Sequence, residues 1–431
     1  MSRSLRRALP RWLQRGLGAA ALTALAVPAL AADASPAPGS VADAPIDGNA
    51  TNFFSPTRLG RLAPAARAGW ARYLGRSAQQ RSLDRAAMAA ELRATGRAEM
   101  TPAPYAKGFH LDASMTEAWF KSPAARAVGE NLLSFQTPSG GWSKRVDMLK
   151  APRVPGESYY SENTHWDYIA TIDNDSTTEQ LRFIAELSRA QPDARYARAF
   201  QKGISYLLDA QFPNGCWPQV YPLRGGYHDA ATFNDDATVN ALRLLREAGQ
   251  GRFPLISRQQ RRLAEGSVKR GIGCLLAAQV KVQGKLGVWA QQHDPLDLTP
   301  VQARSYELIG LAGRESASIT QFLMEEEAPS PAEVLAVHAA VGWFRAHEIW
   351  NYDYDFYTGL KRVEGAGPLW ARLSELETGY SIFSNRDGIK LYDWNQLTDR
   401  RQGYAWYGKE PVRILAAYEV WSAKHPLPRG R

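Results

Sequence analysis

The length and composition of the chain describe a globular protein and argue against a disordered one. Its 431 residues can hold one large domain or two to three ordinary ones, and 45% of them are hydrophobic while 22% are charged. The formal net charge is +9, but much of it lies in the first residues of the chain, so it says little about the folded part.

Residues 1–31 have the pattern of a secretory signal peptide. The basic stretch MSRSLRRALPRWLQRG precedes LGAAALTALAVPAL, which is too short to span a bilayer, and Ala29-Leu30-Ala31 forms a small-x-small cleavage site. Arg6 and Arg7 leave a twin-arginine export route open beside the ordinary one. We therefore expect a secreted protein, in the periplasm or outside the cell.

Removal of the signal peptide lowers the net charge of the chain. The signal holds five arginines and no acid, so its removal lowers the net charge from +9 to about +4. A mildly basic protein of this kind is not expected to bind nucleic acid. No later apolar run is long enough for a membrane helix, so we expect no membrane attachment after cleavage, and a monomer.

The rest of the chain divides by composition into a linker and one domain. Residues 32–58 are rich in Ala, Pro, Ser and Gly, as in a flexible lead-in. A single domain is expected over 59–431, with 59–124 as a less regular helical extension rich in Ala, Arg and Leu.

An apolar pair, a glutamine, a glycine and a tryptophan recur three times along this domain. The copies are LLSFQTPSGGW, LLDAQFPNGCW and LLAAQVKVQGKLGVW, with Trp142, Trp217 and Trp289 spaced by 75 and 72 residues. A helical pattern precedes each tryptophan and a second one follows it. This repeat predicts stacked helical hairpins that curl into an all-α, α/α toroid (a partial α/α barrel) with long functional loops, leaving a cleft lined by loops and inner-helix starts.

The turn tryptophans admit two interpretations. A Gln-x3-Gly-x-Trp turn is a packing device in terpene-cyclase-like helical toroids. Trp142 and Trp217 could equally stack on a sugar ring at the cleft, because tryptophan offers an apolar face and a hydrogen-bonding edge.

Pairs of acids follow the first two turns at equivalent points of the repeat. TIDNDST contains Asp173 and Asp175, and FNDDAT contains Asp235 and Asp236. One acid of each pair could cap the following helix, but two adjacent acids repel each other unless a cation lies between them. Four converging carboxylates suit calcium, which takes six to eight oxygen ligands. Two of them could instead serve as the acid and base of an inverting glycosidase.

Cations in the loops beside these turns point to an anionic sugar. Lys144 follows the first turn tryptophan, Arg304 lies in PVQARSYE after the third, and Arg386 lies in SIFSNRDGIKLYDW. Taken singly, each is more often part of a surface ion pair. Together, in aromatic and glycine-rich loops, they favour a substrate that carries many negative charges.

The cysteines give no clear prediction. An exported protein could pair Cys216 with Cys274, but two cysteines do not make a disulfide framework. We expect no bridge between them.

Six motifs in order resemble the pectate lyases of polysaccharide lyase family 10. They are QTPSGGWSKR, TIDNDSTTEQLRFIAEL, QFPNGCWPQVYP, YHDAATFNDDATVNALRLL, WAQQHDPLDLTPVQARSYELIGLAGRES and SIFSNRDGIKLYDWNQLTDRRQGYAWYG. The similarity runs from about residue 125 to 424. It implies an α/α-toroid enzyme that cleaves α-1,4-linked polygalacturonate (pectate) by calcium-assisted β-elimination and releases 4,5-unsaturated oligogalacturonides.

The resemblance also assigns roles to the candidate residues. It makes Arg304 the catalytic base, with Arg314 in LAGRES as a rival that more often forms a structural ion pair, and it predicts an alkaline pH optimum. Arg386 and Lys144 would hold substrate carboxylates. Four acids would bind calcium or organise the metal-bound substrate: Asp173 and Asp235 first, then Asp175 and Asp236.

Two other functions are compatible with the helical repeat. A toroidal glycoside hydrolase would use paired aspartates, and a non-catalytic protein would only bind polysaccharide. A terpene-cyclase-like role is disfavoured by the export signal and by the cations around the turns.

Overall fold

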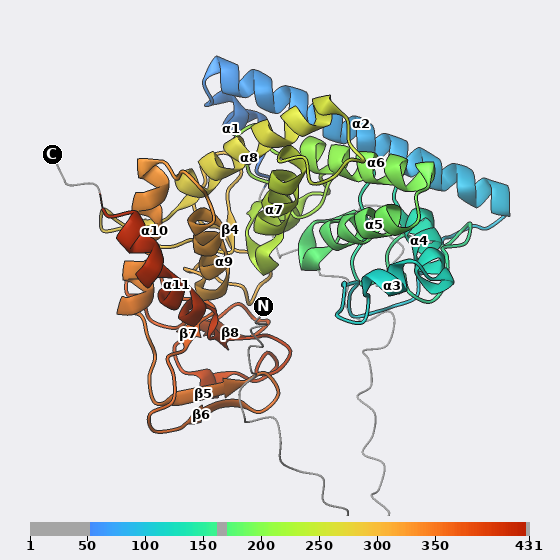
Figure 1. Cartoon of the computed structure of the whole chain (residues 1–431). Helices are drawn as coiled ribbons and strands as arrows, with labels where there is room; N and C mark the ends of the chain where they lie inside the picture. The colour runs from blue at the N-terminus through green and yellow to red at the C-terminus, as the bar shows by residue number, and fades with distance from the viewer. Residues whose placement is uncertain (1–51, 162–169, 428–431) are drawn as a thin grey trace, which may run out of the picture. The chain divides into compact units, whose positions relative to one another are not determined.

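The computed structural model describes residues 52–161 and 170–427. The predicted signal peptide and most of the predicted lead-in lie outside the described residues. Helices are the main secondary structure of the described chain, and the strands are short (Figure 1). The helices are α1 (Pro56–Gly60), α2 (Pro64–Thr95), α3 (Glu117–Phe120), α4 (Pro123–Phe135), η2 (Asp173–Asp175), α5 (Thr178–Ala190), α6 (Ala194–Ala210), η3 (Gly226–Asp229), η4 (Asn234–Asp236), α7 (Ala237–Gly249), α8 (Arg258–Ala278), α9 (Gly313–Met324), α10 (Pro331–Ala346), η5 (Trp394–Gln396) and α11 (Glu410–Lys424). The strands are β1 (Ala231–Thr232), β2 (Lys281–Val282), β3 (Lys285–Leu286), β4 (Gln292–His293), β5 (Tyr352–Asp355), β6 (Gly359–Arg362), β7 (Trp370–Ala371), β8 (Phe383–Ser384), β9 (Lys390–Leu391) and β10 (Tyr407–Gly408).

Helical hairpins form the body of the fold, as in an α/α toroid. Helix α5 packs on α4 and α6, α7 packs on α8, and α9 packs on α10 and α11 (Figure 1). The starts of the longer helices are set by the sequence. Ser257 and Ser330 each form a capping box at the start of α8 and α10, which satisfies backbone N–H groups that have no partner inside the helix. The predicted all-α toroid is confirmed.

The turn tryptophans close these hairpins from inside. The indole Nε1 of Trp142 donates to the carbonyl of Leu132 at 2.8 Å, and that of Trp217 donates to Leu207 at 2.8 Å. Trp289 makes the same bond to Leu275 at 2.7 Å. All three side chains are fully buried. The indole therefore ties each turn back to the end of the helix that precedes it.

The turn glutamines join each hairpin to the next one. Gln136 Nε2 donates both to the carbonyl of Gly140 in its own turn and to that of Ala199 in α6, each at 2.8 Å. Gln211 bridges Gly215 and Ser267 of α8 in the same way. Gln279 bridges Gly287 and Ala336 of α10. The repeated Gln–Trp pattern is thus a packing device, which explains its recurrence.

A disulfide joins Cys216 to Cys274, and the expectation of unpaired cysteines was wrong. The two Cα atoms lie 5.3 Å apart, within the usual range for a bridge. Cys216 lies in the second turn and Cys274 in α8, so the bridge crosses the interface that Gln211 also spans. Cysteines 58 residues apart in sequence meet because the hairpin brings the turn onto the next helix, a contact that their spacing does not reveal.

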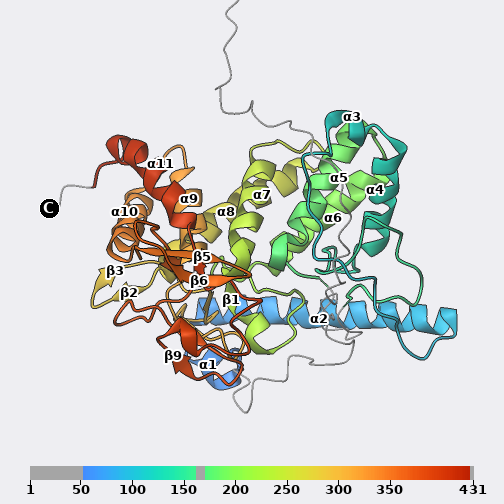
Figure 2. The same cartoon turned by 90° about the horizontal axis from the view of Figure 1, so that it is seen from below.

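The N-terminal helix α2 packs on the hairpins through aromatic side chains. Trp70 and Tyr73 lie against Phe212, and the hydroxyl of Tyr73 donates to the carbonyl of Ala210 at 3.1 Å. Figure 2 shows the 32-residue α2 as one long helix along this side. Phe53 is buried and α1 begins at Pro56, so the packed structure begins before residue 59, where the domain was expected to start. No helix in the described ranges is long and apolar enough to cross a membrane.

The C-terminal third adds short antiparallel strand pairs to the helices. Strands β5 and β6 form a hairpin with Tyr352 opposite Arg362, and β8 pairs with β9. A second hydrophobic cluster, separate from the helical core, lies beneath them and includes Tyr306, Trp394 and Trp406. This cluster supports the loops that carry Arg304 and Arg386.

Candidate active site

One cavity brings together four of the residues that the sequence singled out. We call it the polar cavity; its volume is about 160 Å³. Lys144, Asp173, Asp235 and Arg304 all line it. The rest of its lining is also polar or aromatic: Arg145, Tyr160, Asn174, Gln219, Tyr227, Asn234, Gln292 and Glu307. The cavity therefore joins the first two acid motifs to the loop after the third turn.

The acid motifs adopt an unusual backbone. In η2 and η4, directly before α5 and α7, Asn174, Asp175, Asp235 and Asp236 all have positive φ values between 48° and 61°. Such values are uncommon for residues other than glycine and are concentrated at functional sites. Neither α5 nor α7 has a side-chain hydrogen bond at its N-cap. Asp236 occupies the N-cap position of α7, but its side chain does not make the capping hydrogen bond that was the alternative for these acids.

Asp173 is buried and directed at a lysine. Its Oδ2 accepts a hydrogen bond from Nζ of Lys144 at 2.6 Å. Its other oxygen, Oδ1, is buried without a hydrogen-bond partner. A buried carboxylate oxygen without a partner is costly to maintain, so this atom is suited to accept a cation or a donor from a ligand.

Asp235 is surrounded by positive charge. Arg372 Nη2 lies 3.1 Å from its Oδ1, and Arg314 Nη1 lies 3.5 Å from the same atom. Asn174 Nδ2 donates to its Oδ2 at 3.2 Å. Burial raises the pKa of Asp235, but the charges of Arg372 and Arg314 outweigh this effect and leave the pKa lowered. The neighbouring guanidinium groups therefore favour the ionised form of Asp235.

The second acid of each motif lies outside the lining of the polar cavity. Asp175 Oδ1 accepts from Asn240 of α7 at 2.6 Å, and burial raises the pKa of Asp175. Asp236 lies 4.0 Å from Arg314, and burial followed by the nearby Glu315 raises its pKa to about 6. Convergence of all four carboxylates was expected, and the structure brings only Asp173 and Asp235 into the cavity. No cluster of three or more His, Cys, Asp or Glu residues suited to a metal occurs among the described residues.

Arg304 is held by a carboxylate that sequence reasoning overlooked. Its Nη2 and Nε donate to the two oxygens of Glu307 at 2.5 and 2.8 Å. Burial lowers the pKa of Arg304, but the charge and hydrogen bonds of Glu307 outweigh it and leave the pKa raised well above its ordinary value. The pair fixes the direction of the guanidinium at the cavity.

Burial and nearby cations also act on a neighbouring histidine, His228. The pKa of His228 is lowered by burial, and then by the charges of Arg224, Lys144 and Arg304. The lining of the polar cavity holds three cations and three carboxylates, namely Lys144, Arg145, Arg304, Asp173, Asp235 and Glu307. The low dielectric of a partly buried site strengthens the interaction of each with a charged ligand or ion.

The chain matches the model of one protein family over residues 136–415, described as pectic acid lyase. The match includes every residue that lines the polar cavity. The chain belongs to the pectic acid lyase family.

Solved structures give the same result for this pectate lyase. A family 10 polysaccharide lyase from Cellvibrio cellulosa is 32% identical, with a TM-score of 0.63, and the match covers 74% of this chain and all of that one. An aspartate-to-alanine mutant of the Cellvibrio cellulosa family 10 enzyme, in complex with trigalacturonic acid, gives the same values. A comparison with curated proteins found no match. The predicted membership of family 10 is confirmed.

Trp142 and Trp217 do not line the polar cavity of the lyase. Both rings are fully buried and bonded to the carbonyls of the preceding helices. Of the two interpretations for these residues, stacking on a sugar is therefore wrong, because a ring used to close a hairpin cannot also face solvent.

Arg386 lies near the polar cavity without lining it. The side chain is exposed, and its Nε lies 3.9 Å from Asp399. Its Cζ atom lies 5.9 Å from the centroid of the Tyr306 ring, and Cζ of Arg304 lies 4.9 Å from the same centroid. Arg386 is thus loosely held at the edge of the site.

A fourth turn, missed at the sequence level, supplies another site residue. Trp370 Nε1 donates to Phe344 at the end of α10 at 2.8 Å, as the other turn tryptophans do. Arg372 follows two residues later, and Lys144 and Gln219 follow Trp142 and Trp217 by the same interval. This spacing is a signal that could have identified Arg372, which binds both Asp235 and the fully buried Glu315.

Proposed function

We propose that the lyase cleaves polygalacturonate by calcium-assisted β-elimination with Arg304 as the base. The observation that carries this proposal is the lining of the polar cavity, where Lys144, Asp173, Asp235 and Arg304 converge from three separate loops. A neutral polysaccharide would have no use for these cations. The trigalacturonic acid bound to the Cellvibrio cellulosa enzyme supports the same class of substrate.

The chemistry requires removal of a weakly acidic proton. The C5–H bond of a galacturonate lies beside the carboxylate, and its electron pair forms the C4=C5 double bond as the C4–O4 bond breaks. The proton passes to the base, and the leaving oxygen takes a proton from water. The negative carboxylate opposes loss of this proton, so the site must supply positive charge close to it.

The residues of the polar cavity fit a calcium ion. Three side-chain oxygens of its lining are buried without a hydrogen-bond partner: Asp173 Oδ1, Gln219 Oε1 and Gln292 Oε1. Carboxylate and amide oxygens are the ligands that calcium prefers. We propose Asp173 and Asp235 as the protein carboxylates of this site. Bound calcium would neutralise the substrate carboxylate and so make the C5 proton more acidic.

To act as the base, Arg304 would first have to lose a proton, and this deprotonation costs free energy. A guanidinium gives up its proton only with difficulty, and Glu307 stabilises the charged form further. Each pH unit below the pKa of the base costs about 1.4 kcal/mol. The proposed mechanism therefore requires an alkaline optimum, and a rate maximum near pH 5 would contradict an arginine base.

Lys144 and Arg386 would hold carboxylates of the substrate. Lys144 lines the polar cavity beside Asp173. Its ammonium would bind a substrate carboxylate in exchange for the carboxylate of Asp173. Arg386 is exposed and only loosely paired, so its planar guanidinium is available for a second uronate.

One assay tests the whole proposal. The enzyme is incubated with polygalacturonate, with calcium or with a chelator, and ultraviolet absorbance of the unsaturated product is followed. Absorbance that rises only with calcium supports the proposal. New reducing ends without absorbance would show hydrolysis, and no product at all would leave only binding.

A matched pair of variants tests the base. Arg304→Ala should abolish turnover while the protein stays folded. Arg182, which forms a similar two-point ion pair with Glu247 away from the cavity, is the control, and Arg182→Ala should keep its turnover. Arg304→Ala with normal turnover would contradict the assignment.

We also propose that the lyase is exported. Residues 1–31 have the pattern of a signal peptide, and the Cys216–Cys274 bridge is typical of proteins that fold in an oxidising compartment. Detection of the protein, cut after Ala31, in the periplasm or the medium would test this.

A further inference from the structure

The C-terminal third contains a second and larger cavity. We call it the tyrosine cavity; its volume is about 690 Å³, within the range of ligand sites. It is lined by residues of β5, β6 and β10, of the loop between β7 and β8, of the segment after β9, and by Ile349 before β5: Ile349, Tyr352, Leu360, Glu375, Thr378, Tyr380, Ser381, Tyr392, Asp393, Asn395 and Tyr407. In the described part of the chain, no residue lines both this cavity and the polar cavity.

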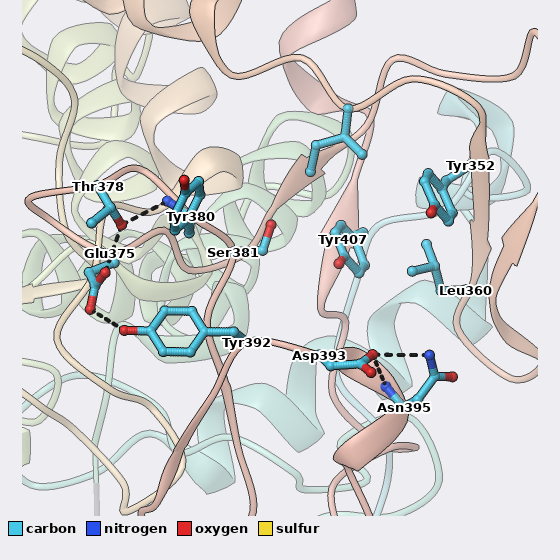
Figure 3. A pocket seen from close by; sticks show the side chains of 11 residues that line it. Tyr352, Leu360, Glu375, Thr378, Tyr380, Ser381, Tyr392, Asp393, Asn395 and Tyr407 are labelled. Atoms are coloured by element: carbon cyan, nitrogen blue, oxygen red, sulfur yellow. Dashed lines mark hydrogen bonds between the residues drawn. The ribbon is translucent and has the colours of Figure 1, made fainter.

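Tyrosine rings are the main feature of this site. Tyr380 is 67% exposed and Tyr392 is 55% exposed, although both sit at a cavity. Figure 3 shows Tyr352 and Leu360 together on one side, Tyr392 on the other and Tyr407 between them in this view. Exposed aromatic faces at a concave site suit the apolar C–H face of a sugar ring.

The ring of Tyr392 is held in place before any ligand binds. Its hydroxyl donates to Oε1 of Glu375 at 2.7 Å, and Lys390 donates to the same oxygen at 2.6 Å. Oε2 of Glu375 accepts from the hydroxyl of Thr378 at 2.6 Å. The dashed lines around Glu375 in Figure 3 mark its bonds to Tyr392 and Thr378. A ring fixed in this way loses little freedom on binding, which favours affinity.

The charges of the tyrosine cavity differ from those of the polar cavity. Its charged lining residues are two acids, Glu375 and Asp393, and the lining as described contains no lysine or arginine. Lys390 lies beside it but is paired with Glu375. A uronate would therefore meet carboxylates and no available cation. Thr378, Ser381 and Asn395 instead offer hydroxyl and amide groups that can hydrogen-bond sugar hydroxyls.

We propose that the tyrosine cavity is a second carbohydrate-binding site, and that it takes a neutral saccharide. The lyase would then bind an anionic segment of a polysaccharide at the polar cavity and an uncharged segment here. Two sources supply the same neutral chemistry: methyl-esterified galacturonate residues and uncharged sugars such as galactose. The assignment rests on the rings and charges of this cavity and does not require the elimination mechanism.

Calorimetric titration tests the site directly. The probes are the trimethyl ester of trigalacturonic acid and β-1,4-galactotriose, each titrated into the full-length protein in the presence of a chelator. We expect heat of binding from at least one probe, and the comparison of the two identifies the source. Saturation of the protein with trigalacturonic acid should leave this binding unchanged, because the anion occupies the other cavity.

Variants distinguish this site from unspecific contact. Tyr380→Ala combined with Tyr392→Ala should weaken binding of the neutral probe about tenfold or more, with unchanged circular dichroism and unchanged turnover of trigalacturonate. Tyr357→Ala is the control, because Tyr357 is 72% exposed but does not line the cavity. Tyr392→Phe keeps the ring and should bind within about threefold of the wild type.

Three results would overturn the proposal. One is the absence of binding by both neutral probes. Another is displacement of the neutral probe by trigalacturonic acid. The third is full affinity in the double tyrosine variant or, if that variant does not fold, a loss of about tenfold or more in Tyr392→Phe, which keeps the ring.

Discussion

Replacement of Glu307 by glutamine should shift the pH dependence of the lyase. In the structure both oxygens of Glu307 accept hydrogen bonds from Arg304. Hydrogen bonds to charged groups contribute about 1.5–3 kcal/mol. The Arg304 side chain is 36% exposed, so solvent screening favours the lower end. A loss of about 1.4 kcal/mol lowers the pKa of Arg304 by about one unit.

The assay is kcat/KM for polygalacturonate from about pH 7 to about pH 11, with saturating calcium. Over this whole range the pH lies below the pKa of Arg304, so the rate should rise with pH without levelling off, and Glu307→Gln should reach a given rate about one pH unit lower than the wild type. Glu247→Gln, which breaks the similar pair with Arg182, is the control and should leave the profile in place. An unmoved profile in a folded Glu307→Gln enzyme would refute Arg304 as the base.

Three further predictions concern other parts of the lyase. Asp173→Asn should raise the calcium concentration needed for half-maximal activity about 10- to 100-fold. Asp175→Asn, outside the cavity lining, should change this concentration less than about twofold. Equal effects of the two substitutions would contradict Asp173 as a calcium ligand. Trp142→Phe should lower the free energy of unfolding by about 1–3 kcal/mol, because the carbonyl of Leu132 loses its donor, with KM unchanged; a raised KM at unchanged stability would argue against packing. Burial raises the pKa of Asp84 to about 6, so the folded state binds the proton of Asp84 more tightly than the unfolded state, and stability falls as the pH rises from about 4 to about 6. Above that range Asp84→Asn should therefore unfold at a higher temperature than the wild type. An identical unfolding midpoint at pH 8 would contradict this.

The architecture could be read from the sequence because the repeat is local. An apolar pair, a glutamine and a tryptophan mark the end of each helix within 11 residues in the first two copies and 15 in the third, and the period separates the hairpins. Asp173 and Asp235 could be located for the same reason, since they stand at equivalent points of neighbouring repeats. Their meeting in one cavity follows from the stacking of the hairpins.

Other features depend on contacts that sequence spacing does not encode. The bridge between Cys216 and Cys274 forms across two hairpins. Arg372 reaches Asp235 from more than 130 residues away. Trp142 packs in the core because it is buried, and the sequence alone does not show whether a tryptophan at a turn is buried or faces solvent.

Because the turn glutamines hold neighbouring hairpins together, the stacking of the helices does not depend on the length of the turns. The third turn is longer than the first two, with the bonded leucine and tryptophan 14 positions apart instead of 10, yet Gln279 still reaches α10. The extra residues of this turn lie in the small β2–β3 hairpin. An engineer could therefore graft a foreign segment between Val282 and Lys285 and expect the helices to keep their stacking.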